Sequence, residues 1–93
     1  MEDNKKQYLL LLSEIIAKEA IIFGPDMAIL KARRVASLVI DNNGNVIDIK
    51  GYSADAAQEL VNEYIKLSEQ AVKDVINQVF IKYPQIKKVN IPT

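Results

Sequence analysis

The stretch from Ser53 to Tyr83 constrains the fold more than any other part of the chain. Ser53 is a favourable N-cap residue, and Pro84 disfavours helical geometry at Tyr83. No Gly or Pro interrupts the interval, so the pattern predicts one long amphipathic helix that ends near Lys82. Its apolar residues recur at i, i+3, i+4 and i+7, the spacing of one helical face: Ala57, Leu60, Val61, Tyr64, Leu67, Ala71, Val72, Val75, Ile76, Val79, Phe80 and Tyr83.

The length of this predicted helix indicates self-association. At ~1.5 Å per residue it spans roughly 44 Å, whereas a compact domain of this size has a diameter near ~30 Å. The helix would extend beyond its own domain and expose an apolar stripe, which usually marks an interface. We therefore expect a homodimer through the long helix, although a monomer with a kinked or shorter helix is the alternative. The expected interface residues are Tyr64, Leu67, Ser68, Ala71, Val72, Val75, Ile76, Val79 and Phe80.

The N-terminal apolar run predicts a second, more buried helix. Residues 1–4 are expected to be frayed, and Asn4 with Gln7 resembles a loose capping box that starts a helix near Lys5. Apolar side chains cover most of the circumference up to Phe23, so this helix should be buried on more than one side. We expect it to contact the long helix and, on its other side, a sheet or a second subunit. Its polar residues are Gln7, Glu14 and Lys18 in one narrow stripe, with Ser13 and Glu19 beside it.

These charged residues also argue against a membrane span. They interrupt the apolar run well short of the ~18 residues that such a span needs, and no small-residue cleavage site follows. The sequence therefore predicts a core helix with no membrane partner.

A short helix should follow the corner at Gly24 and Pro25. Asp26 can cap a helix from Met27 to about Arg33. Alternatively Gly24 and Pro25 open this helix, with Pro25 at its first position.

Two strands and a tight turn are predicted next. The first strand, Val35 to Asp41, is nearly continuously apolar, which indicates burial on both faces. The second, Val46 to Ile49, alternates, with Ile47 and Ile49 expected inward and Asp48 and Lys50 outward. Asn42-Asn43-Gly44-Asn45 between them is a hairpin signal.

The remaining residues, 85–93, form a tail or a short edge strand, because Val89 and Ile91 alternate with polar Lys88 and Asn90. The predicted fold is α+β in a single domain, residues 1–93. Its order is helix, short helix, β-hairpin, long amphipathic helix and a C-terminal edge strand.

The residue inventory disfavours catalysis and cofactor binding. The chain contains no Cys and no His, which removes thiol chemistry and nearly all zinc and haem sites. No Gly-rich phosphate loop and no activated serine motif occurs. We expect no enzyme, no metal and no cofactor, and the cysteine-free composition fits a cytoplasmic protein.

The basic residues offer one candidate anion patch. The dense cluster Lys31, Arg33 and Arg34 could join Lys87 and Lys88 and hold phosphates if the two groups meet in space. However, formal net charge is +0, and no aromatic residues are interleaved, which disfavours a nucleic-acid partner.

The region from Val35 to about Phe80, including the run VASLVIDNNGNVIDIKGYSADAAQELVNEYIKLSEQ, resembles roadblock/LC7-type modules. The shared features are a hairpin with a D-x-x-G turn at Asp41–Gly44 and a following helix rich in small and apolar residues. The resemblance implies a homodimer that binds small GTPases or scaffolds complexes. The chain departs from that family in its extra short helix, its longer second helix and its missing later strands.

From these observations we expect a non-enzymatic homodimer that acts as a regulatory or scaffolding module and has itself, or another protein, as its partner. The alternatives are a nucleic-acid-associated protein that uses the basic patch and a small-molecule sensor. A sensor would carry its pocket between the first helix and the sheet.

Overall fold

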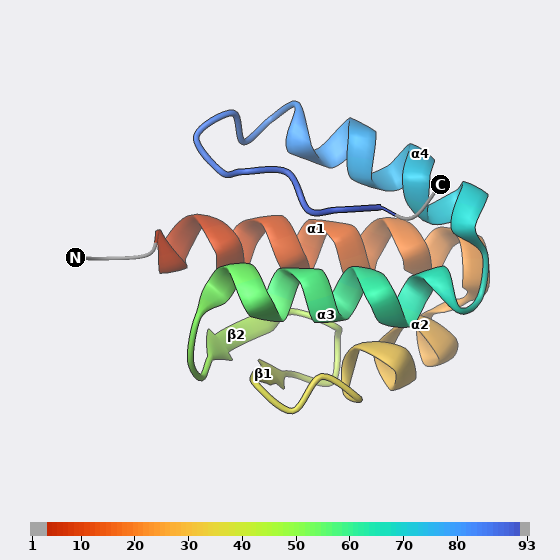
Figure 1. The fold of residues 1–93 in the computed structure, drawn as a ribbon. Helices are drawn as coiled ribbons and strands as arrows, with labels where there is room; N and C mark the ends of the chain where they lie inside the picture. Colours follow the sequence, from red (N-terminus) through yellow and green to blue (C-terminus); the bar gives the residue numbers. More distant parts are fainter. Residues whose placement is uncertain (1–3, 92–93) are drawn as a thin grey trace.

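The computed structural model describes residues 4–91, and these form four helices and one hairpin. The elements are α1 (Lys5–Phe23), α2 (Pro25–Ala32), β1 (Leu38–Ile40), β2 (Val46–Ile49), α3 (Ser53–Ile65) and α4 (Glu69–Phe80). Helices α1 and α3 form a middle layer and run in the same direction (Figure 1). Helix α4 and the C-terminal segment cover one side of this layer, and α2 with the hairpin covers the other. The expectation of an α+β fold is confirmed.

The prediction of one long C-terminal helix is wrong, because the chain turns back after Ile65. Ser68 has extended backbone angles (φ −165°, ψ 113°), and its hydroxyl accepts a hydrogen bond of 3.3 Å from the Ala71 amide, so it is the N-cap of α4. Helix α4 then runs opposite to α3 (Figure 1). The longest dimension of the described chain is 35 Å, too short for the roughly 44 Å of a continuous helix.

The limits of the other helices agree with the predictions to within a few residues. Helix α1 begins at Lys5 and ends at Phe23 as expected, but Asn4 forms no side-chain cap and has a left-handed backbone (φ 61°), so the capping box is wrong. Pro25 occupies the first turn of α2 with Gly24 as N-cap, which confirms the alternative start. Ser53 is the first residue of α3 and Tyr52 is the N-cap, so the prediction of Ser53 as N-cap is wrong.

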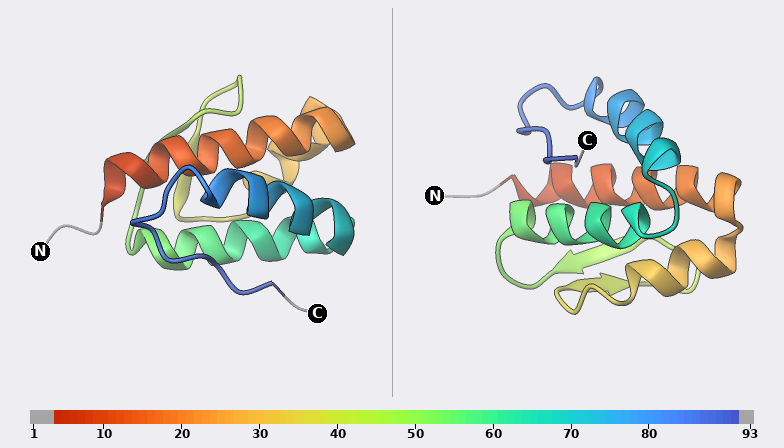
Figure 2. Two further views of the ribbon diagram at one scale, coloured as in Figure 1. Left: turned by 90° about the horizontal axis from the view of Figure 1, so that it is seen from above. Right: turned by 45° about the vertical axis from the view of Figure 1, so that its right-hand side comes forward.

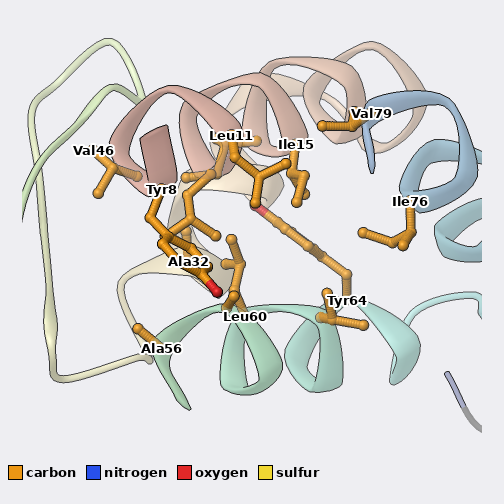
Figure 3. Close-up of a cluster of buried hydrophobic side chains, with 14 of the residues drawn as sticks. Tyr8, Leu11, Ile15, Ala32, Val46, Ala56, Leu60, Tyr64, Ile76 and Val79 are labelled. Carbon is orange, nitrogen blue, oxygen red and sulfur yellow. The ribbon is translucent and has the colours of Figure 1, made fainter. Parts of the chain in front are cut away.

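The core lies on both sides of α1. Five apolar residues of this helix are buried and face α2, α3, α4 or β2, as Figure 3 shows for Tyr8, Leu11 and Ile15. The prediction that α1 is buried on more than one side is confirmed. Two further views show α4 and the hairpin on different sides of α1 (Figure 2).

The hairpin is shorter and more irregular than predicted. Residues 35–37 form turns, so β1 begins at Leu38 and belongs to a two-stranded antiparallel sheet. Leu38 pairs with Ile49 and Ile40 with Val46, and the register shifts between these pairs. Because of this bulge, Val46 and Ile49 are both buried and Ile47 is 57% exposed, which corrects the prediction that Ile47 faces inward.

The hairpin is held against α1 at three points. The Ser13 hydroxyl accepts a hydrogen bond of 2.8 Å from the Val46 amide and donates one of 2.7 Å to the Leu9 carbonyl. Lys5 forms an ion pair with Asp48. At the turn, a side chain on Gly44 would come within 3.2 Å of Ile16, so the hairpin tip lies directly on the helix.

The predicted edge strand does not form in residues 85–91, which have no strand structure. Instead Ile86 is buried, and Val89 and Ile91 pack against the core. The Gln58 side chain substitutes for a pairing strand, since it accepts from the Asn90 amide (2.9 Å) and donates to the Asn90 carbonyl (2.8 Å). Residues 1–3 and 92–93, for which fraying and a tail were predicted, lie outside the described residues.

Candidate functional site

The predicted interface stripe lies inside the chain's own core. Because α4 turns back, both halves of the stripe pack within the same chain, and the overhang that motivated the prediction does not exist. Leu67, Ser68 and Ala71 are half-buried around the α3–α4 turn. The other six residues are at most 7% exposed: Tyr64, Val72, Val75, Ile76, Val79 and Phe80. These six side chains therefore pack within the chain's own core.

The predicted anion patch is not assembled either. Lys31, Arg33 and Arg34 belong to α2 and the residues after it, whereas Lys87 and Lys88 lie in the C-terminal segment, on the other side of the middle layer (Figure 1). Because the two groups do not meet, they offer no shared surface to a phosphate.

Three of the five cations also have partners within the chain. Arg33 donates to the Asp41 carbonyl at 3.2 Å, and Arg34 forms an ion pair of 3.0 Å with Glu63. Lys88 donates to the Asn77 side chain. Of these contacts, only the ion pair with Glu63 sets a negative charge against a cation of the predicted patch.

A shallow cleft of about 490 Å³ lies beside Arg34, between the residues after α2 and α3. Two cations, Arg34 and Lys66, and two carboxylates, Glu59 and Glu63, line it, so the charges balance. The space expected for a ligand, between α1 and the sheet, is instead occupied by the Ser13–Val46 contact and by Gly44. The cleft lining is Arg34, Val35, Ala36, Glu59, Asn62, Glu63 and Lys66.

The feature that stands out is the outward face of α1. Leu10 and Ile21 are 63% and 85% exposed, and Ala17 between them is also exposed. Their spacing of seven and four residues places all three on one side of the helix. This outward face, defined by Leu10, Ala17 and Ile21, is opposite the buried face of α1.

Two further exposed isoleucines, Ile81 and Ile47, each adjoin a residue that contacts α1. Ile81 is 78% exposed, and the next residue, Lys82, binds Glu14 of α1 at 2.6 Å. Ile47 is 57% exposed and adjoins Val46, whose amide binds Ser13. A row of exposed apolar side chains on one helix face usually marks an interaction site.

Glu19 is the second unusual feature. It is fully buried on α1 (0% exposed), and neither carboxylate oxygen has a hydrogen-bond partner among the described residues. Burial raises the pKa of Glu19 from 4.5 to about 7, because a buried carboxylate loses hydration that nothing replaces. The prediction that Glu19 lies beside the polar stripe is wrong.

The sequence contains a signal for the buried position of Glu19, but it lies in the spacing of the residues and not in their type. Leu12, Ile15, Ile16 and Glu19 follow the i, i+3, i+4, i+7 spacing of a buried face, so register rather than polarity places Glu19 inside. Likewise, the apolar residues of the outward face were expected in the core, because nearly the whole helix is apolar.

No group of three or more potential metal ligands occurs among residues 4–91. Within the same residues, no helix combines the length and the apolar character needed to cross a membrane. No protein-family model, curated protein or solved structure matches the chain. The resemblance to roadblock/LC7-type modules therefore stays a prediction.

Proposed function

We propose that the chain is a self-associating protein-interaction module, which forms a two-fold homodimer through the outward face of α1 and serves a regulatory or scaffolding role. The observation that supports this proposal is the exposed row of Leu10, Ala17 and Ile21 on one side of α1. Burying such side chains gains about 25 cal/mol per Å² of apolar surface.

The outward face is self-complementary, as a two-fold interface requires. In an antiparallel pairing of two α1 helices, Leu10 of one copy lies opposite Ile21 of the other, because both are equally far from the centre of the face. Ala17 lies near that centre, where its small side chain allows the two backbones to approach closely. The apolar side chains at the two ends then cover one another.

The charges on this helix follow the same symmetry. Glu14, which pairs with Lys82 of its own chain, lies beside Lys18 of the other copy. Lys18 has no ion-pair partner among the described residues. A formal net charge of +0 also means that two copies do not repel each other at long range. Charge complementarity therefore favours a second copy of this chain as the occupant of the face.

Sedimentation over a range of concentrations tests the proposal with a matched pair of leucines. Leu10→Lys places a charge in the expected interface, whereas Leu30→Lys places the same charge on α2, where Leu30 is 60% exposed. We expect Leu10→Lys to weaken association at least ~10-fold and Leu30→Lys to leave the dimer unchanged. A monomeric wild-type protein, or equal effects of both variants, would overturn the proposal.

A covalent test uses the absence of cysteine from the chain. Ala17→Cys should give a disulfide-linked dimer under mild oxidation, because the two copies of residue 17 lie close to the symmetry axis. Asn77→Cys, at an exposed position on α4, serves as the control and should stay monomeric under denaturing electrophoresis.

A further inference from the structure

Glu19 is the last buried residue of α1. The four residues that follow it, Ala20 to Phe23, are half-buried or exposed, and Ile21 is 85% exposed. The C-terminal turn of the helix is therefore anchored to the core at Glu19 and by no fully buried residue beyond it. An anchor that carries an ionisable group makes this packing depend on charge.

The surroundings of Glu19 offer no compensation for a negative charge. The titratable group that faces it from α3 is Tyr64, whose pKa is raised above its ordinary value by burial and by the Glu19 charge. The Tyr64 hydroxyl already donates to the Ala28 carbonyl at 2.7 Å. No charged side chain of α2, α3 or α4 forms an ion pair with Glu19 within the described residues.

The chain has room to respond at the end of α1. Gly24, the residue after the helix, has φ 91°, and nothing lies within 4 Å of the position where its side chain would begin. Its amide donates the last hydrogen bond of the helix, to the Ala20 carbonyl at 2.9 Å. A glycine in open space can change its backbone angles at little steric cost.

We propose that Glu19 is a charge-dependent latch, which holds the C-terminal turn of α1 against the core when neutral and releases that turn into water when ionised. Gly24 is the hinge of this movement. The carboxyl loses its proton to solvent on release, and the open turn allows water to hydrate the carboxylate. This inference concerns the free chain and does not depend on self-association.

The direction of the pH dependence follows from the raised pKa of Glu19. The latched state binds the proton more tightly than the open state, so latching is fully favoured below pH 4.5 and weakens as the pH rises to about 7. Above that pH the carboxylate is ionised and the latched state carries the full cost of burying its charge. From pH 4.5 to about 7 the population of the open turn increases by at most roughly 300-fold, because linkage allows a tenfold change per pH unit.

Hydrogen exchange at the Gly24 amide measures the latch directly. We expect its protection factor, corrected for intrinsic exchange, to fall at least ~10-fold between pH 5 and pH 8.5. In Glu19→Gln, which carries no ionisable group, the protection factor should be constant over this range. Glu14→Gln removes a surface carboxylate of the same helix, 23% exposed, and should behave as the wild type.

A protection factor that does not change with pH in the wild type, or that changes equally in Glu19→Gln, would overturn the proposal. If Glu19→Gln does not fold, Glu19→Met provides the same test, because it removes the charge with a side chain of similar length. The measurement is made on dilute wild-type chain and repeated with Leu10→Lys, so that loss of the dimer and loss of the latch give separate results.

Discussion

The Tyr64 hydroxyl donates a hydrogen bond of 2.7 Å to the Ala28 carbonyl oxygen, and both residues are fully buried. This bond joins α3 to α2 across the interior, and the Tyr64 side chain extends from α3 toward α1 (Figure 3). A tyrosine that was expected to face a partner chain is therefore a structural link within one chain.

Replacing Tyr64 with phenylalanine should destabilise the fold. The change removes the hydroxyl and leaves the Ala28 carbonyl buried without its partner, which costs about 1–3 kcal/mol. Urea denaturation should show the loss at an unchanged denaturant slope. Tyr52→Phe is the control, since Tyr52 is 76% exposed and should tolerate the change; equal losses in both variants would contradict the role of this hydrogen bond.

A charge at Val79 should unfold the chain. Val79 is 0% exposed, and burial of an unpaired carboxylate costs more than about 3 kcal/mol. We expect Val79→Asp to lose its helical circular dichroism, while Gln78→Asp, at the neighbouring exposed position, keeps it. A Val79→Asp chain that keeps its helical signal would contradict the burial of Val79 in the core.

The glycine in the hairpin turn should be more sensitive than the glycine that follows the hairpin. Gly44 and Gly51 both have positive φ angles, 87° and 97°, but only at Gly44 would a Cβ atom meet another side chain, Ile16 at 3.2 Å. Both alanine variants lose roughly 1–2 kcal/mol from backbone strain. Gly44→Ala should lose further stability because the hairpin must move away from α1. Thermal unfolding separates the two contributions, and similar melting temperatures would count against the close contact.

Asp41 should stabilise the hairpin at neutral pH and lose this effect in acid. Its carboxylate accepts hydrogen bonds from the amides of Asn43 and Asn45, both at 2.9 Å, and these bonds lower its pKa. A lowered pKa means that the contribution is present above the unfolded value of about 4 and is lost as the pH falls through the folded value. Asp41→Ala should therefore be less stable than the wild type at pH 7 and approach it near pH 2.

Local patterns were sufficient for most of the secondary structure. Gly24 and Pro25 fix the end of α1 because neither residue continues an ordinary helix, and Asn43-Gly44 fixes the hairpin because few residues accept left-handed backbone angles. The break at Ser68 also had a local signal, since a serine followed by Glu69 is a common helix start. This signal was outweighed by the uninterrupted apolar periodicity on both sides of it.

The candidate sites were harder to predict, because they depend on which face of α1 the rest of the chain covers. The apolar residues of α1 extend around most of its circumference, so periodicity alone cannot separate Leu11, which is buried, from Leu10, which is exposed. The buried position of Glu19 escapes prediction for the same reason. A carboxylate is normally an outward residue, and only the register of the covered face places it inside.

The sequence by itself determined α1, α2 and the hairpin and their order, because caps, turns and hydrophobic periodicity act over a few neighbouring residues. The tertiary structure decided where those elements pack. By turning back at Ser68, the chain buries α4 against α1 within a length of 35 Å, and this arrangement buries the predicted interface and leaves Leu10, Ala17 and Ile21 uncovered. The physical reason is that apolar burial is non-directional: local sequence specifies that a surface must be covered, and only the packing of the whole chain specifies what covers it.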